Sequence, residues 1–526
     1  MKELLIRLLA PIATVSVILL SFSTEYATGQ LSPAKVQEER LGDVPDDSVK
    51  MDFSPVGCHV AFVSPQADGS VAVVADGRAG APYESIVGAG LGADCLHFSP
   101  DGKHLAYLAS RGNAQYIVVD GREGSPYERG EATLWFSPDS NRLAYAANKG
   151  LGQFIVIDGH EGPAFDFIIT PTLRFSPNGK RIAYTAIMSG QQGNGSYVVV
   201  DGHGGNPYSA IGLNIRFSPD GKRVAYYAKR DDKWLAVVDG QEIPAFPADA
   251  DPDDAAAGFP VFSPDSKLMA CLVINGAKWH LAVDGKVGAA YDEIKCDWSN
   301  LSPLFSPNSQ RVAYRARKSD KWTVVVDGQD GGSFDEITSG PWFSSDSSRV
   351  AYSAKTGDKS VAIVDGEPGK AYDDIGMPIS TGPFSPHENR LAYAARLGDK
   401  WFTVINGQEG PPFDDTTNHF PSFSSFFSPD GQHLAYSATR ADQSFLMLDG
   451  REGPAFGLVF GPVFSADSKH VAYEAIGEGD KTRSVVDGKQ SPLYDRILSG
   501  GFLANGNWQY IAVMGRTMYR VTQSTR

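Results

Sequence analysis

One unit of sequence is repeated along almost the whole chain, and this repeat limits the folds that the chain can adopt. Residues 98–127 hold its clearest copy, FSPDGKHLAYLASRGNAQYIVVDGREGSPY. The copies follow one another at intervals of 37 to 45 residues, which is typical of proteins built from repeated supersecondary units. Each copy opens with a Phe: Phe53, Phe98, Phe136, Phe175, Phe217, Phe262, Phe305, Phe343, Phe384, Phe427, Phe464 and, in a degenerate twelfth copy, Phe502.

Two turn sequences frame the strands of each copy. In the clearest copy, Ser-Pro-Asp-Gly at 99–102 and Asp-Gly at 120–121 bracket the apolar runs 105–109 and 116–119. Adjacent Asp and Gly tolerate the positive φ of tight hairpin turns, and Val and Ile favour pleated strands. The repeat is therefore predicted to be a small antiparallel β-meander.

A small residue stands beside a large one at the same place in the copies. The residue eight positions after the opening Phe is Ala in all eleven full copies, and the next residue is aromatic in ten, with Cys271 as the exception. Such a pair predicts a packing layer where neighbouring sheets approach closely. The strand that ends in Asp-Gly is almost wholly apolar, which is typical of a strand buried on both faces. We therefore expect each sheet to be covered on both faces by neighbouring copies.

The motif Phe-Ser-Pro-Asp-Gly-x-x-Leu-Ala-Tyr resembles the WD40-like repeat of the TolB β-propeller, over about residues 49–522. The resemblance implies an all-β protein of about twelve four-stranded blades. Propellers usually have four to eight blades, so we expect two six-bladed rings, residues 49–300 and 301–526, with one large closed ring as the alternative. The last copy has only three expected strands, and the lead-in at 30–48 could supply the fourth.

The family's own activities do not follow from this resemblance. TolB carries an α/β domain before its propeller, and the chain has no room for one. The same repeat accompanies prolyl oligopeptidases, whose hydrolase domain carries a Gly-x-Ser-x-Gly motif that is absent from this sequence.

The N-terminus has the pattern of a secretory signal peptide, residues 1–29. Lys2 and Arg7 precede an apolar run from Leu8 to Phe22, and the small-residue site Ala27-Thr28-Gly29 predicts cleavage before Gln30. The apolar run is short for a membrane span, so we expect a periplasmic or secreted protein with no span after cleavage, an uncleaved anchor being the alternative.

Charge and cysteine content exclude several classes of function. The formal charge is −15, whereas nucleic-acid binding needs a basic surface, so no nucleic-acid partner is expected. The four cysteines, Cys58, Cys95, Cys271 and Cys296, show no C-x-x-C spacing, so no zinc or redox site is predicted and their pairing is left open. The ten His are scattered, and no phosphate-binding loop is found, so no metal, cofactor or catalytic residue is predicted.

Length variation among the copies falls at one end of the meander. The connection between the second and third strands, as at 189–196, and the connection between blades vary, and both emerge on the same side. Loops on a rigid scaffold commonly carry binding residues. Four copies place a Trp at the start of the third strand, where the alternative is packing between blades, and two further candidates lie in long loops: Trp234, Trp279, Trp322 and Trp401, then Trp298 and His419.

Two functions fit these features. The first is an exported, non-enzymatic β-propeller scaffold that binds a protein, peptide or envelope component, or a small ligand, through the face with the variable loops. The second is a propeller hydrolase or lyase that acts on a sugar or lactone at the central channel, with site residues isolated in the chain. The absence of a catalytic motif favours the first.

Overall fold

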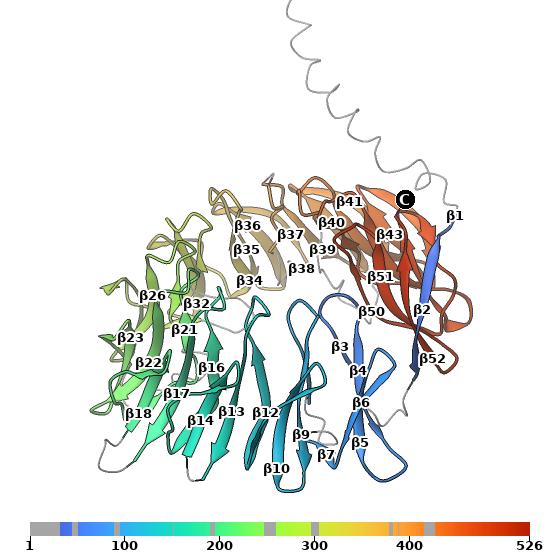
Figure 1. Cartoon of the computed structure of the whole chain (residues 1–526). Helices are drawn as coiled ribbons and strands as arrows, with labels where there is room; N and C mark the ends of the chain where they lie inside the picture. The colour runs from blue at the N-terminus through green and yellow to red at the C-terminus, as the bar shows by residue number, and fades with distance from the viewer. Residues whose placement is uncertain are drawn as a thin grey trace, which may run out of the picture. The chain divides into compact units, whose positions relative to one another are not determined.

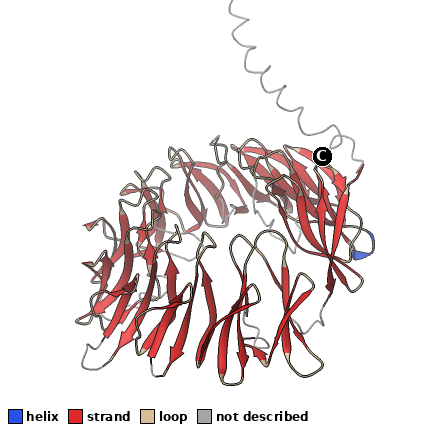
Figure 2. Cartoon of the chain, in the orientation of Figure 1, coloured by secondary structure: helices blue, strands red, loops and turns tan. Residues whose placement is uncertain are grey.

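The computed structural model describes residues 32–44, 51–88, 95–150, 152–189, 195–246, 259–295, 304–377, 382–387, 389–414 and 427–525. These residues form 52 β-strands in twelve sheets, with one short 3-10 helix at Glu478–Asp480 (Figure 2). The predicted fold class, an all-β propeller of about twelve blades, is confirmed.

The chain divides into two compact units. Residues 45–384 hold eight sheets in chain order (Figure 1), which are β3–β6 (51–83), β7–β11 (85–127), β12–β15 (129–161), β16–β19 (167–204), β20–β24 (210–246), β25–β28 (261–287), β29–β33 (293–330) and β34–β37 (336–372). Residues 1–44 and 385–526 hold β39–β41 (392–414), β42–β44 (435–456), β45–β49 (458–490) and β50–β52 (496–523). The division into rings at residue 300 stays a prediction.

The fourth sheet shows how one copy of the repeat folds. Its strands β16 (Phe167–Phe175), β17 (Ile182–Met188), β18 (Gly195–Val200) and β19 (His203–Gly204) pair antiparallel in that order. Between β16 and β17 lies the Ser-Pro-Asn-Gly turn, and between β18 and β19 the Asp-Gly turn, with Asp201 at φ 52°. The predicted meander is confirmed.

The hydrophobic core lies between consecutive sheets. One cluster joins Ala144 and Ile155 of the third sheet to Ile168, Tyr184 and Val199 of the fourth, and all five are at most 1% exposed. The same arrangement recurs from sheet to sheet in each unit. The packing layer predicted from the Ala-aromatic pair is therefore confirmed.

Cys271 takes the aromatic slot of its copy and is 1% exposed, as expected of a buried thiol. Burial raises the pKa of this thiol to about 12. Cys58 and Cys95 are buried like Cys271, and Cys296 lies outside the described residues.

The first described strands belong to the same unit as the last ones. Strand β2 (Val36–Asp43) pairs antiparallel with β52 (Thr517–Gln523), which gives the sheet order β2-β52-β51-β50. Strand β1 (Ser32–Pro33) pairs parallel with β49 (Lys489–Gln490). Leu41 is 1% exposed, and the hydroxyl of Tyr494 donates a 2.6 Å hydrogen bond to Glu38. Strand β2 thus takes the place of the fourth strand that the last copy lacks.

The predicted signal peptide, residues 1–29, lies outside the described residues. Within the part of the chain that the structure describes, no helix is long and apolar enough to cross a membrane.

Candidate binding surface

The Ser-Pro-Asp-Gly turns are held by their own side chains and by the next sheet. The Ser99 hydroxyl donates to Asp101 at 2.7 Å and accepts the backbone N–H of His104 at 3.0 Å. The backbone N–H of Asp101 donates to the Ser140 hydroxyl of the following sheet at 3.0 Å. The residues that define the motif therefore shape the turn and join neighbouring blades.

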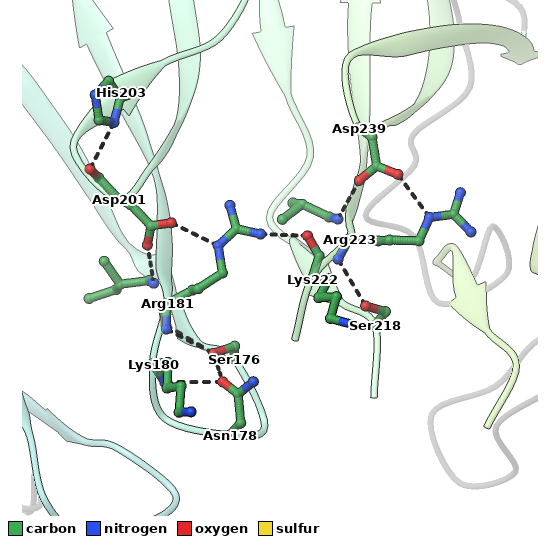
Figure 3. A network of polar contacts seen from close by, with 12 residues as sticks. Ser176, Asn178, Lys180, Arg181, Asp201, His203, Ser218, Lys222, Arg223 and Asp239 are labelled. Carbon is green, nitrogen blue, oxygen red and sulfur yellow. Dashed lines mark hydrogen bonds and ion pairs between the residues drawn. The ribbon is translucent and has the colours of Figure 1, made fainter. Parts of the chain in front are cut away.

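An arginine that follows this turn forms a latch between sheets (Figure 3). Arg181 Nε donates to Asp201 at 2.7 Å, and its Nη1 donates to the backbone carbonyl of Lys222 in the next sheet. The same guanidinium lies 5.8 Å from the ring centroid of Phe217, the opening Phe of that next sheet. The repeated Arg and Phe are thus partners across the blade boundary. The latch recurs at Arg142, Arg223 and Arg311.

The Asp of each Asp-Gly turn is occupied by the fold. Asp201 has a positive φ, and its Oδ1 accepts the backbone N–H of Ile182 at 2.9 Å while Oδ2 accepts from Arg181. These acids are confirmed as turn residues. No group of three or more His, Cys, Asp or Glu in the described ranges is placed to hold a metal ion.

The opposite end, which bears the variable loops, has a latch that the sequence reasoning missed. Lys321, at the start of the third strand, pairs with Asp335, which follows the aromatic residue of the fourth strand. This lysine holds the pKa of Asp335 below its usual value, and Asp335 Oδ2 also accepts the N–H of Gly357 in the next sheet at 2.7 Å. The signal was a Lys and an Asp 14 residues apart, which recur at Lys278 and Asp292, Lys359 and Asp373, and Lys400 and Asp414.

The four regular tryptophans lie at the start of their third strands, β23 (Lys233–Val238), β27 (Lys278–Val283), β32 (Lys321–Val326) and β40 (Lys400–Ile405). Trp234 is 8% exposed and belongs to a core cluster, and Trp279 and Trp322 pack half-buried against such clusters. Trp401 is also half-buried. Their role in binding stays a prediction. Trp298 and His419 lie outside the described residues.

Cations of the same chain lie over three of these rings. Lys229 is 5.8 Å from Trp234, and Arg396 is 5.9 Å from Trp401. Trp322 has both Lys295 and Arg317 at 5.9 Å. A cation over an indole face is attracted by the ring quadrupole, so these contacts hold the rings in place within the fold.

Large apolar side chains are exposed mainly at two places on the sheets. At the end with the variable loops are Phe167, at the start of β16, and Leu397 and Met514, at hairpins between second and third strands. Along first strands or their connections are Leu213, Phe460 and Val463. The end with the Ser-Pro-Asp-Gly and Asp-Gly turns exposes Val56 and, just after the Asp284 turn, Val287 on a fourth strand.

Comparison with known proteins finds solved structures that are similar to part of this chain. No protein-family model matches the chain, and no curated protein matches it significantly. The putative TolB from Agrobacterium tumefaciens is 17% identical, over 40% of this chain and 83% of that one, with a TM-score of 0.22. TolB from Acinetobacter baumannii is 17% identical over 54% and 77%, with a TM-score of 0.21. The β-propeller domain of the Trilobed protease from Pyrococcus furiosus is 14% identical over 56% and 98%, with a TM-score of 0.25.

The class of this protein rests on its own repeat and sheets. Its motif and its meander sheets define an all-β propeller repeat protein, and the motif resembles the WD40-like repeat of TolB.

Proposed function

We propose that this protein is an exported, non-enzymatic scaffold that binds a protein, peptide or envelope component through the end of its sheets that carries the variable loops. The observation that supports this proposal is the asymmetry between the two ends. The Ser-Pro-Asp-Gly end has uniform turns whose polar groups form hydrogen bonds to the next sheet. The loops at the other end vary in length, and Phe167, Leu397 and Met514 are exposed there.

Exposed apolar side chains on a polar framework are typical of protein contacts. Single apolar residues are common on any protein surface, but these three lie at the end that also carries the variable loops. The Lys–Asp latches fix the loop bases there, and a rigid base reduces the entropy lost on binding.

The test is a crosslinking pull-down from the envelope fraction of the producing cell. The baits are the mature protein, a variant with Phe167→Glu, Leu397→Glu and Met514→Glu, and a matched control with Val56→Glu and Val287→Glu. Each bait must first show wild-type circular dichroism and an unchanged urea midpoint. A discrete partner held by the wild type and the control, and lost by the loop-end variant, is the expected result.

A partner lost by the control and kept by the loop-end variant would overturn the assignment of the face. A further bait with Trp279→Ala, Trp322→Ala and Trp401→Ala reports on the tryptophans, and Trp234 is left intact because it is part of the core. Failure to capture any discrete partner would contradict the scaffold function.

Export has its own test. We expect N-terminal sequencing of the protein isolated from its producing cell to begin at Gln30, and fractionation to place it outside the cytoplasm. A protein that begins at Met1 or Lys2 in the membrane fraction would instead support the uncleaved anchor.

A further inference from the structure

One position of the repeat changes its chemistry from copy to copy although the Phe that follows it does not. It is the residue just before the opening Phe, at the end of the first strand. Every copy keeps its opening Phe whichever residue stands before it. The repeat therefore does not require one residue type at the preceding position. The position holds Asp52, His97, Trp135, Arg174, Arg216, Val261, Leu304, Trp342, Pro383, Phe426, Val463 and Gly501.

Two consecutive copies place an arginine there. Arg174 lies on β16, the first strand of the fourth sheet, and Arg216 lies on β21 (Arg216–Phe217), a first strand of the fifth. Leu173 and Phe175 pack towards the third sheet. Because side chains alternate along a strand, Arg174 projects to the other side, towards the fifth sheet. Both arginines are half-buried.

Each guanidinium is held in position by its surroundings. Arg174 Nη1 donates to the carbonyls of Pro171 and Leu173, both at 2.7 Å. The Arg216 guanidinium lies 4.1 Å from the centroid of the Phe259 ring. Stacking occupies the face of the planar group, whereas its N–H donors point outward in the plane. This geometry suits an acceptor with two oxygens.

The two charges have no built-in counterion in the described part of the chain. Burial lowers the pKa of both groups, and the charge of Arg174 lowers the pKa of Arg216 further. No carboxylate of the described residues pairs with either group, although the latch arginines Arg181 and Arg223 each have one. The sequence holds 62 acidic and 47 basic residues, so acidic partners are not scarce. Two like charges close together in a partly buried place repel each other, and an anion bound between them offsets this repulsion.

We propose that Arg174 and Arg216 form a binding site for the oxyanion group of a small molecule, a carboxylate or a phosphate, at the first-strand edge of the fourth and fifth sheets. Guanidinium groups bind both kinds of oxyanion through paired, charge-assisted hydrogen bonds. A bound anion also removes the repulsion between the two arginines. The site is separate from the loop end, so it is a second binding activity of the same scaffold.

The test is isothermal titration calorimetry of the mature full-length chain at low chloride, with inorganic phosphate in one arm and succinate in the other. The variants are Arg174→Gln, Arg216→Gln and the double variant, and the control is Arg122→Gln, an exposed arginine. Charge-assisted hydrogen bonds to one anion predict a loss of roughly 10- to 100-fold in affinity for each single variant and loss of measurable binding for the double variant. The control is expected to bind as the wild type does.

Thermal unfolding keeps the test decisive if a variant is altered in stability. The anion that binds should raise the unfolding midpoint of the wild type and the control, and should leave that of the double variant unchanged. The arm that responds identifies the oxyanion as phosphate or carboxylate. Binding of neither anion by the wild type, or equal binding by the double variant, would overturn the proposal. Neither result depends on the pull-down.

Discussion

At the scale of single residues, the repeat motif is a set of contacts between neighbouring sheets. Arg181 connects the Asp201 turn of its own sheet to the Lys222 carbonyl and the Phe217 ring of the next one. These residues therefore recur in the copies of the repeat because they join neighbouring blades. This explains why the strongest sequence signal in the protein says little about its ligand.

Replacement of Arg181 by Ala should lower the free energy of unfolding by about 1 to 2 kcal/mol. The change removes a charge-assisted hydrogen bond whose partners are about one-third exposed and a bond to a carbonyl of the next sheet. Urea unfolding measures the effect, with Arg122→Ala as a control expected to stay within about 0.5 kcal/mol of the wild type. An equal effect of both substitutions would show that the latch does not stabilise the sheets.

Glu474 makes stability depend on pH. It lies on β47 (Val471–Ile476), whose successive residues Ala472 and Tyr473 pack towards the twelfth and tenth sheets respectively. Because side chains alternate along a strand, Glu474 lies on the same face as Ala472, towards the twelfth sheet and Tyr510. Burial raises the pKa of Glu474 from 4.5 to about 7. The folded protein therefore retains a proton that the unfolded chain has already lost.

The free energy of unfolding should consequently fall as pH rises from about 4.5 to about 7, by up to about 3 kcal/mol from this group. Glu474→Gln has no proton to lose, so it should exceed the wild type in stability at about pH 8 and match it most closely at about pH 4.5. Urea midpoints of the two proteins across this range test the expectation. A difference that is independent of pH would contradict it.

At the scale of elements, the start of the third strand is a packing position with graded burial. Trp234 on β23 is in the core, whereas Trp401 on β40 is half-buried beneath Arg396. A slot that is regular in sequence is therefore not equally accessible in every blade.

Trp234→Ala should destabilise the protein by about 3 to 5 kcal/mol, and Trp401→Ala by about half as much, because less apolar surface is lost at the half-buried site. Trp234→Phe keeps most of the apolar ring and should be the mildest change at position 234. Chemical unfolding of the three variants gives the order. Equal losses for Trp234→Ala and Trp401→Ala would contradict the burial described above.

The elements could be predicted from sequence because their signals are local. Asp-Gly turns, the Ala-aromatic pair and the apolar third strand each follow from backbone or packing rules that act within about 30 residues. The contacts between blades could not be predicted, because the carbonyl that accepts from Arg181 and the N–H that Asp335 binds belong to the next copy. The Arg174 and Arg216 pair could have been found by comparing the residue before each opening Phe, which the sequence reasoning did not do.

At the scale of the whole molecule, the two compact units do not follow the order of the chain. Residues 32–44 precede the first repeat but belong with the last ones, through β2 and β52. Tyr494 and Glu38 add a side-chain bond to this pairing. Completion of the last sheet therefore depends on residues from both halves of the sequence.

Hydrogen exchange followed by mass spectrometry in increasing urea tests this arrangement. Peptides from residues 32–44 should lose protection together with those from residues 508–523, because they share one sheet. They should not follow peptides from residues 51–88, the nearest repeat in sequence. Immediate exchange of residues 32–44 in the absence of urea would show that β2 is not stably paired.

The pairing of β2 with β52 also determines when, during synthesis of the chain, the last sheet can form. A ribosome makes residues 36–43 early, but their partner at 517–523 is among the last segments to be made. Until then β2 has no strand to pair with, and the twelfth sheet is incomplete and presents an open edge, which is a site of unwanted strand pairing. The last sheet can therefore form only after the C-terminal strand has been made. Truncation that removes β52 should leave β2 at the N-terminal side and β51 at the C-terminal side with unpaired edges.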